Sequence, residues 1–387
     1  MTKTICVYIG GRANYSSAKS IMLAIQEHND LELQVLIGTA SVVDRYGDIS
    51  RQLEKDGFCV NAKFYNLVEG ENPLTMAKTA GLALIEASTA FDNLSPDIVL
   101  VIGDRYDVLP IAISAIYMNI LLAHTMGGEV TGTIDESIRH SITKLAHIHF
   151  PANQDSFDRI VRLGENRDCV YNVGCPRNDL IKAEVASTDS LLIVQDYFSK
   201  NVGVGPVQDL TNKFFVVSQH PVTTDYGNND LHMTNILEAL SSFELPTILL
   251  WPNSDAGSDE ISRAVRKYRE LYSPSWLQVF KDLPVQIYIH LLNTTACLIG
   301  NSSSGIREGS LLGSPVVNIG SRQNTRLCSS NVITTSNDPN DIKNAISYQL
   351  THGKYPSDSI YGDGTAGVQI ANILSKVSVN LQKTITY

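Results

Sequence analysis

Short apolar runs alternate with longer amphipathic stretches along the first half of the chain. The run at 97–102, Asp-Ile-Val-Leu-Val-Ile, is almost wholly apolar. Such continuous apolar strands are typical of a parallel sheet that is covered on both faces. The alternation of strand and helix patterns therefore predicts an α/β fold. The predicted strands are 5–9, 33–38, 97–102 and 120–123, and the clearest predicted helices are 16–26 and 75–94.

The same rhythm stops after residue 174 and restarts near residue 214. The stretch 183–213 is polar and mixed, so we interpret it as the crossover to a second domain. Two Rossmann-like domains facing a cleft are the simplest architecture, and ligands of such sheets bind beyond the carboxyl ends of the strands. In the second half, the predicted strands are 214–218, 246–251, 296–300 and 315–320, and the predicted helices are 231–242 and 258–271.

Composition narrows the class of protein. With 387 residues the chain has room for two domains, and its 43% hydrophobic and 18% charged residues allow buried cores. The formal net charge of −10 argues against a simple polybasic protein that binds nucleic acid or a membrane surface. An anionic substrate stays possible, because a few local cations and helix starts suffice to bind one.

The cysteines and the longest apolar runs indicate the cellular compartment of the protein. The six cysteines show no CxxC spacing, so we expect reduced thiols and a cytoplasmic protein rather than a disulfide or zinc scaffold. No run approaches the 18 apolar residues of a membrane-spanning helix. The N-terminus is expected to be a first strand rather than a signal peptide.

Two motifs follow predicted strands of the first half. Gly10-Gly11-Arg12 ends the first strand and opens a helix, where backbone amides and Arg12 can meet a phosphate. The alternative is a plain tight turn. Gly103-Asp104-Arg105 follows the most apolar strand, where α/β active sites lie, although Asp104 could equally cap the next helix.

A third motif places more carboxylates in the same half. His124-Thr125-Met126-Gly127-Gly128-Glu129 follows a strand, and Asp135 then begins a helix. Asp135 and Arg139 are four residues apart and share a helix face, as do Glu136 and His140. One interpretation is surface ion pairs; the other gathers Asp104, Glu129 and Asp135 at one site, where crowded carboxylates raise one another's pKa for acid–base work.

His147 and His149 lie on one face of a predicted strand. A metal needs a third ligand, and nothing nearby has ligand spacing. We therefore favour hydrogen-bonding roles for both and expect no metal and no cofactor.

The second half carries the strongest signal for an anion site. Gly300-Asn301-Ser302-Ser303-Ser304 follows a strand and opens a helix, so small side chains and backbone amides form a cradle for an anion. Glu308 further along could accept from ribose hydroxyls, and Arg322 after the next strand could add a cation. His220 follows another strand and is a further candidate.

Taken together, these motifs resemble the hydrolysing UDP-N-acetylglucosamine 2-epimerase family, including the epimerase half of the animal bifunctional epimerase/kinase. The matching stretches run from about residue 10 to residue 365. They are GDRYDVLPIA, GGEVTGTIDESIRHSITKLAHIH, HPVTTD, WPNSDAGSDE, GNSSSGIREG, PVVNIGSRQ and IYGDG.

The resemblance implies the two-domain GT-B architecture, with nucleotide bound mainly by the second domain. It divides the chain into 1–185, 186–365 and a segment 366–387 that crosses back to the first domain. The implied reaction removes the C2 proton while the nucleotide leaves C1, and water then adds to the resulting 2-acetamidoglucal. The products are N-acetylmannosamine and a nucleoside diphosphate, and a homodimer or homotetramer is expected.

Carried over by motif, Asp104 and Asp135 match acid–base residues of the family, and His220 matches its catalytic or diphosphate-contacting histidine. The residues that match nucleotide contacts are Arg12, Ser302, Ser303, Glu308 and Arg322. Glu129 is a further catalytic candidate, and Met126, Arg105 and Arg139 are candidates for the sugar pocket.

Met126 departs from the family pattern, because many relatives carry Glu or His there. A thioether cannot transfer a proton, so one expected acid–base residue is absent. A more apolar Met could suit a 4-acetamido-6-deoxy sugar, so a UDP- or GDP-N,N′-diacetylbacillosamine epimerase of legionaminic acid synthesis is the alternative to a UDP-N-acetylglucosamine epimerase of sialic acid synthesis. A non-hydrolysing epimerase, a GT-B glycosyltransferase and a non-catalytic nucleotide-sugar sensor are the other hypotheses.

Overall fold

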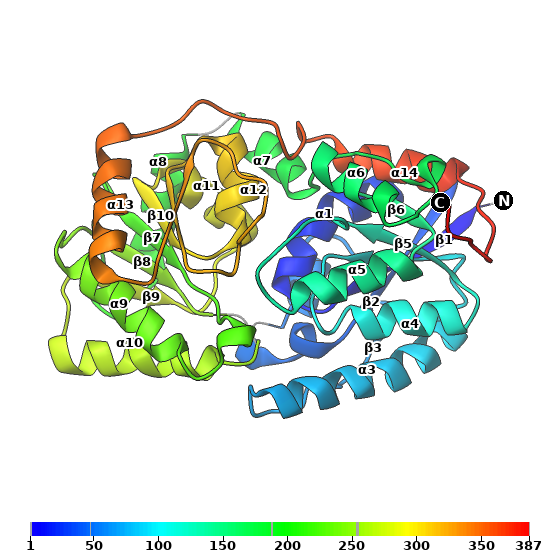
Figure 1. Cartoon of the computed structure of the whole chain (residues 1–387), viewed down its shortest axis with the longest axis horizontal. Helices are drawn as coiled ribbons and strands as arrows, with labels where there is room; N and C mark the ends of the chain where they lie inside the picture. The colour runs from blue at the N-terminus through cyan, green and yellow to red at the C-terminus, as the bar shows by residue number, and fades with distance from the viewer. Residues whose placement is uncertain (1, 47, 187–188, 253–254, 387) are drawn as a thin grey trace. The chain divides into compact units, whose positions relative to one another are not determined.

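The structure is a computed structural model of the chain and describes residues 2–46, 48–186, 189–252 and 255–386. It divides into two compact units. Unit 1 comprises Met1–Val130, Ile134–Asp179 and Tyr361–Tyr387, and unit 2 comprises Thr131–Thr133 and Leu180–Ile360. Each unit is built around one six-stranded parallel sheet with helices on its faces, so the predicted pair of Rossmann-like α/β domains is confirmed (Figure 1). The cleft expected between them, and the domain bounds expected from the sequence, stay predictions.

The sheet of unit 1 has the strand order β3-β2-β1-β4-β5-β6, and every pairing is parallel. The strands are β1 Lys3–Ile9, β2 Leu31–Ile37, β3 Ala62–Lys63, β4 Ile98–Ile102, β5 Leu121–Thr125 and β6 Ile148–Phe150. The helices are α1 Arg12–Gln26, α2 Ser50–Lys55, α3 Pro73–Leu94, α4 Leu109–Tyr117, α5 Asp135–Leu145, α6 Gln154–Arg162, α7 Arg177–Val185, which continues into unit 2, and α14 Ala366–Lys376.

The C-terminal segment packs within unit 1. Helix α14 lies against α1, and the Asp179 carboxylate accepts hydrogen bonds from the first two backbone amides of α14, at Ala366 (3.0 Å) and Gly367 (2.6 Å). Figure 1 shows both chain termini at the same end of this unit. An N-terminal helix end favours a carboxylate, so Asp179 anchors the returning helix.

The sheet of unit 2 has the order β12-β11-β10-β7-β8-β9. Numbered within its own unit, this is the same order as in unit 1. The strands are β7 Phe215–Ser218, β8 Thr247–Leu250, β9 Leu277–Phe280, β10 Cys297–Gly300, β11 Val316–Ile319 and β12 Val332–Thr335. The helices are α8 Ser190–Lys200, α9 Asn229–Ser241, α10 Ser258–Tyr272, α11 Val285–Thr294, α12 Ser303–Leu312 and α13 Pro339–His352.

Apolar side chains fill both faces of the second sheet, as the unbroken apolar strands predict. Val217 of β7 belongs to a core with α9, α10 and α13, whereas its neighbour Val216 belongs to a core with α8, α11 and α12. Successive residues of one strand thus anchor opposite layers of helices.

The stretch 183–213 differs from the plain crossover that its polarity suggests. It contains helix α8, whose Val194 and Phe198 are buried in the core of unit 2. Phe198 packs edge-on against Phe280 with ring centroids 4.9 Å apart. A few apolar residues at helical spacing suffice for this contact and are easily missed among polar ones. Strands β3, β9 and β12 were also not predicted.

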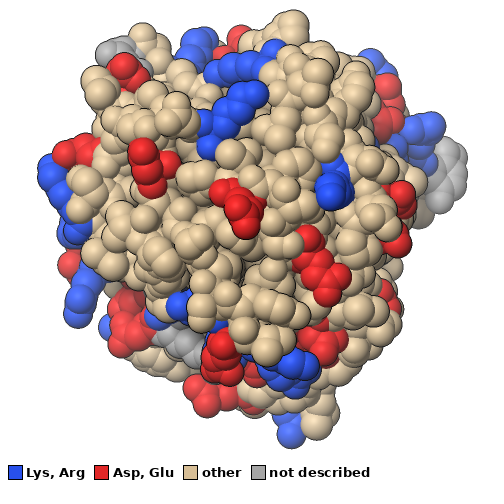
Figure 2. Space-filling view, turned by 90° about the vertical axis from the view of Figure 1, so that its left-hand side faces the viewer, with Lys and Arg blue, Asp and Glu red and all other residues tan. Residues whose placement is uncertain are grey.

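The surface carries both signs of charge. Figure 2 shows one face, on which Lys and Arg side chains are interspersed with Asp and Glu among uncharged residues. Within the described ranges, no helix has the combined length and apolar character needed to cross a membrane.

Candidate active site

The acid–base candidates of unit 1 follow the carboxyl ends of β4 and β5. Asp104 lies two residues past β4, after Gly103, whose φ of 77° is in the left-handed region. Helix α4 begins later, with Val108 at its N-cap position and no side-chain cap. Asp104 is therefore not the cap of the next helix, which removes the alternative role that the sequence left open.

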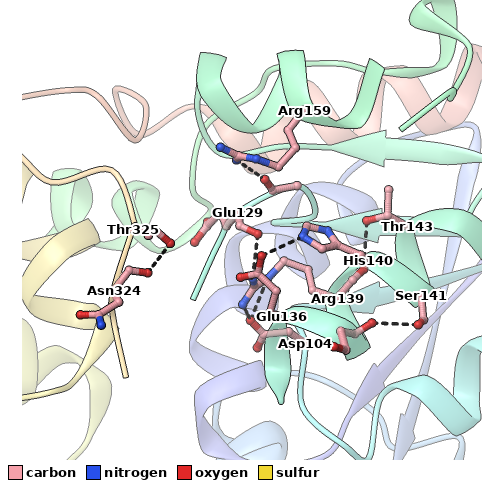
Figure 3. A network of polar contacts seen from close by, with 12 residues as sticks. Asp104, Glu129, Glu136, Arg139, His140, Ser141, Thr143, Arg159, Asn324 and Thr325 are labelled. Atoms are coloured by element: carbon pink, nitrogen blue, oxygen red, sulfur yellow. Dashed lines mark hydrogen bonds and ion pairs between the residues drawn. The ribbon is translucent and has the colours of Figure 1, made fainter. Parts of the chain in front are cut away.

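Arg139 of α5 is the hub of this site (Figure 3). Its Nε donates to Oδ2 of Asp104 at 2.9 Å, and its Nη2 donates to the same oxygen. Its Nη1 donates to the backbone carbonyl of Glu129 at 2.7 Å. The Arg139 side chain is fully buried, whereas that of Asp104 is 20% exposed. The guanidinium thus fixes one carboxylate oxygen while the carboxyl group keeps access to solvent.

The pKa of the Arg139 guanidinium reflects the carboxylates around it. Burial alone would lower the pKa of its guanidinium, but the charges of Asp104, Glu129 and Asp135 outweigh it and raise that pKa. The three carboxylates that the sequence placed together are thus brought together around one buried cation. Asp135 is the first residue of α5, and Glu136 beside it contacts His140 at 3.3 Å between Oε1 and Nε2. The two pairs four residues apart on α5 were therefore correctly placed on shared faces.

A buried histidine that the sequence reasoning did not select supports Asp104. His124 Nε2 lies 2.8 Å from the carbonyl oxygen of Gly103, and its Nδ1 lies 3.3 Å from Oγ1 of Thr143. Burial lowers the pKa of His124 to about 3, so its ring is neutral and Nε2–H donates to the carbonyl. The signal was a histidine inside an apolar strand, where a polar ring needs partners.

Arg12 and Arg105 line the neighbouring strand ends. Arg12 is the first residue of α1, as the Gly-Gly-Arg motif predicts, and burial lowers its pKa to about 10. Arg105 Nε pairs with Oδ1 of Asp107 at 3.1 Å. Asp107 is fully buried, and a Cβ on Gly10 would overlap its Oδ2. Asp107 was missed, because nothing in its spacing distinguishes it from a helix-start acid.

Met126 adopts a left-handed backbone conformation with φ of 59° and is 4% exposed. Its N–H donates to Phe150 O at 2.8 Å, and its Sδ lies 3.8 Å from Sγ of Cys175. Position 126 therefore holds a buried thioether packed on a thiol, close in the chain to Gly128 and Glu129. Arg159 Nη1 holds the Gly128 carbonyl at 2.6 Å, which restrains this turn.

In unit 2 the hub is a neutral amide. Asn301, fully buried after β10, accepts from the His220 backbone N–H and donates to the His220 carbonyl, both at 2.8 Å. Its own carbonyl accepts from Gln323 Nε2 at 2.8 Å and from Arg322 Nη1 at 3.3 Å. Three loops that carry candidates are thus tied to one side chain and its backbone. The sequence reasoning selected His220 and Arg322 but neither Asn301 nor Gln323.

The serine-rich helix start is as predicted. Ser302 is the N-cap of α12 and Ser303 its first residue. Ser302 Oγ lies 2.9 Å from Ser304 Oγ, which in turn lies 2.5 Å from the hydroxyl of Tyr288. Glu308 is buried on the same helix. Hydroxyls and amides meet at the start of this ten-residue helix, and the anion site expected there stays a prediction.

His147 and His149 make hydrogen bonds, as the sequence favoured. His147 Nδ1 accepts from the Leu122 backbone N–H at 3.0 Å, and His149 Nε2 lies 3.3 Å from Oε2 of Glu165. Among the residues that the structure describes, no group of three or more His, Cys, Asp or Glu is arranged to hold a metal ion.

Comparison with known proteins gives the family. Residues 23–375 match the family described as UDP-N-acetylglucosamine 2-epimerase. The chain belongs to this family of enzymes. The chain is 30% identical over 382 residues to a UDP-N,N′-diacetylbacillosamine 2-epimerase (hydrolyzing) of Legionella pneumophila, covering 99% of this chain and 98% of that protein. It is also 30% identical to a UDP-N-acetylglucosamine 2-epimerase of Neisseria meningitidis, over 94% and 92% of the two chains.

Solved structures agree with this epimerase fold. A UDP-GlcNAc 2-epimerase from Neisseria meningitidis bound to UDP-GlcNAc superposes with a TM-score of 0.79, at 16% identity over 97% of this chain and all of that one. The Methanocaldococcus jannaschii UDP-GlcNAc 2-epimerase in complex with UDP-GlcNAc and UDP also gives 0.79, over 96% and 99% of the two chains.

Proposed function

We propose that this epimerase-family chain hydrolyses a UDP-linked 2-acetamido sugar with inversion at C2, converting UDP-N-acetylglucosamine and water into N-acetylmannosamine and UDP. The observation that carries the proposal is the Asp104 carboxylate held through one oxygen by buried Arg139, with Glu129 and Asp135 around the same cation. Several carboxylates in one polar cluster provide both a proton acceptor and a proton donor.

In the proposed elimination step, one carboxylate of the cluster takes the proton from C2 while the C1–oxygen bond to the diphosphate breaks. The electron pair of the C2–H bond forms the C1–C2 double bond of the 2-acetamidoglucal, and the pair of the broken bond leaves with UDP. In the hydration step, the oxygen of water bonds to C1 and the water gives one proton to an ionised carboxylate of the cluster. The electron pair of the double bond meanwhile takes a proton from a second carboxylic acid on the other face of C2. Asp104 and Asp135 are our candidates for these exchanges, with Glu129 as a third.

The polar loops of unit 2 would hold the nucleotide. The start of α12 at Ser302 and Ser303 offers hydroxyls and backbone amides to the diphosphate, and Arg322 and His220 are tied to the same loops by Asn301. Glu308 would accept from the ribose. Donors fixed before the reaction stabilise the charge that develops on the leaving diphosphate, so no metal is required by this proposal.

A second substrate is favoured by one relative and one residue. The Legionella protein named as a diacetylbacillosamine epimerase matches along nearly the whole chain. Met126 is buried and apolar, a side chain that suits a sugar lacking the 6-hydroxyl. UDP- or GDP-N,N′-diacetylbacillosamine is therefore the alternative substrate, and the product would then serve legionaminic rather than sialic acid synthesis. We further propose that the protein is cytoplasmic. We also propose that it is a homodimer or homotetramer, which light scattering on the purified protein would test.

The test is a proton NMR time course in D2O with UDP-N-acetylglucosamine. We expect free UDP and N-acetylmannosamine that carries deuterium at C2. Intact UDP-N-acetylmannosamine would instead indicate a non-hydrolysing epimerase. If the diacetylbacillosamine nucleotides alone react, the alternative substrate replaces the first. Binding of all these nucleotides without turnover would contradict the enzymatic proposal and favour a sensor.

A further inference from the structure

Unit 1 contains a polar cavity of about 690 Å³ that shares no residue with the Arg139 cluster. Its wall comes from 147–171 and from 372–386, so the end of α14 and the segment after it cover one side. All of these residues lie within unit 1. The volume falls in the range of cavities that bind small molecules.

The cavity lies at the amino end of the first sheet. His147, in its wall, directly precedes β6 and is bonded to Leu122 near the start of β5. Lys3, the first residue of β1, donates to the carbonyls of Leu374 and Val377 beside it, at 3.1 and 2.6 Å. Asp104 follows the opposite ends of the same strands. Only the His147 end of the wall lies at the amino ends of the strands, because His149 is paired with His124 within the sheet.

Glu165 in the cavity wall is paired with two lysines, of which Lys383 lines the cavity and Lys144 does not. The Glu165 carboxylate, 4% exposed, accepts from Lys144 Nζ at 2.5 Å and from Lys383 Nζ. Burial would raise the pKa of Glu165, but hydrogen bonds from His149, Lys144 and Lys383 lower it to about 2, so it stays ionised. Burial nevertheless lowers the pKa of Lys383. The Glu165 carboxylate is shared with Lys144, so it offsets only part of the cost of burying the Lys383 ammonium group. An anion placed here would stabilise the second ammonium.

His149 adds a buried acceptor to the wall. Its side chain is 1% exposed, and its Nε2 faces Glu165. Burial lowers its pKa, so the ring is neutral, and Nε2–H then points at the carboxylate while Nδ1 offers a lone pair. Within the described part of the chain, this Nδ1 is buried without a hydrogen-bond partner. A buried acceptor left this way is unfavourable, and a hydroxyl donor from a ligand would satisfy it.

The remaining wall is rich in neutral hydrogen-bonding groups. Amides and hydroxyls are contributed by Asn166, Asn372, Asn380, Gln382 and Thr384. Lys376 and Asp168 also line it, so the four charged side chains of the wall balance, and the surplus positive charge beside Glu165 is that of Lys144. Amides and hydroxyls in this number match the alternating donors and acceptors of a polyol.

We propose that this cavity binds an anionic, polyhydroxylated compound of monosaccharide size, a sugar carboxylate or a sugar phosphate, with its anionic group at the lysines of the wall and a hydroxyl on His149 Nδ1. The proposal does not depend on the reaction that the carboxylate cluster catalyses. It assigns the chain a second ligand site, which shares no residue with that cluster.

Calorimetry on the full chain with saturating UDP tests the site, using glucuronate, glucose 6-phosphate and neutral glucose as probes. We expect at least one anionic probe to bind at millimolar concentration in the presence of UDP, at least tenfold more tightly than glucose. Binding of glucuronate alone would indicate a carboxylate ligand, and binding of glucose 6-phosphate alone a phosphate. Failure of both, displacement by UDP, or equal affinity for glucose would overturn the proposal.

Two further measurements locate the binding. Lys376 is exposed, so Lys376→Gln should fold normally and weaken the anionic probe about tenfold, because an ion-assisted contact is lost. Lys343→Gln, at an exposed lysine of α13 in unit 2, is the matched control and should change nothing. The nitrogen-15 resonance of His149 Nδ1 should move when the probe is added. An unmoved resonance, or equal effects of the two lysine variants, would contradict the assignment.

Discussion

Asp104 and Asn301 occupy equivalent places in two sheets of the same strand order. Each follows the fourth strand of its own unit, β4 or β10, and each is preceded by a glycine with positive φ, 77° at Gly103 and 129° at Gly300. Asp104 is partly exposed and is held by the guanidinium of Arg139. Asn301 is fully buried and ties loops together with neutral hydrogen bonds.

The difference shows that the same turn after the fourth strand can present either a charged carboxylate or a neutral amide. A carboxylate that is proposed to exchange protons must reach solvent or substrate, and in unit 1 a buried cation holds Asp104 while leaving it partly exposed. The proposed nucleotide site needs several donors fixed at once, and unit 2 places a buried amide where the loops of His220 and Arg322 meet. The sequence difference at this point is Gly-Asp against Gly-Asn.

The largest effect is expected at Asp104. Asp104→Asn keeps the shape of the side chain but removes the proton acceptor, so turnover should fall about a thousandfold. Binding of UDP, measured by calorimetry, should change little, because the nucleotide candidates other than Arg12 lie in unit 2. Near-normal turnover would remove Asp104 from the acid–base role.

Removing the cation of unit 1 should cost stability as well as activity. Arg139→Met leaves Asp104, Glu129 and Asp135 without their shared countercharge, so the free energy of unfolding should fall by about 3 kcal/mol. Arg263→Met is the control, because Arg263 is 66% exposed and 4.0 Å from Asp230. That exposed pair should contribute less than about 1 kcal/mol. Equal losses in urea denaturation would show that Arg139 is not the hub.

Alanine substitutions at Gly103 and Gly300 compare the backbone of the two equivalent loops directly. An added Cβ at Gly103 meets nothing within 4 Å, whereas at Gly300 it would overlap the carbonyl oxygen of Ser218. Gly103→Ala should therefore cost only backbone strain, about 1 kcal/mol, and Gly300→Ala about 3 kcal/mol in unfolding free energy. If Gly103→Ala is as costly, the loop at Asp104 is tighter than the structure shows.

His124 makes stability depend on pH. Its folded pKa of about 3 lies below the ordinary 6.5, so the unfolded chain takes up a proton first as pH falls. Protonation of His124 in the unfolded chain should lower the free energy of unfolding by about 2 kcal/mol as pH falls from 6.5 to 5, and further toward pH 3. His124→Gln keeps a side-chain N–H donor but removes the titration, so its unfolding free energy should fall less steeply over this range. Parallel curves would refute the neutral buried ring.

The smallest effect is expected at Arg322. Arg322→Ala should weaken UDP binding about tenfold through loss of a charge-assisted hydrogen bond, with a lesser change in turnover at saturating substrate. The same calorimetric titration on Arg263→Met should match the unchanged protein. A pure turnover defect with unaltered UDP affinity would place Arg322 in the chemistry instead.

Much of the fold could be predicted because its signals are local. The apolar run of β4 and the serine-rich start of α12 can each be recognised within ten residues of sequence, and both were found where expected. Helix α8 was missed because its few buried side chains sit in a polar stretch and only the core of unit 2 uses them. The short strand β3 carries too few residues for a pattern.

The sequence by itself determined which carboxylates and loops stand at strand ends, since strand and helix patterns place them there without reference to distant residues. Only the tertiary structure decided the partners. Arg139 reaches Asp104 across 35 residues, and Asn301 reaches His220 across 81. These pairings follow from strand order in each sheet, which brings remote strand ends together. The hubs Arg139 and Asn301 could be recognised only when the side chains around them were in place.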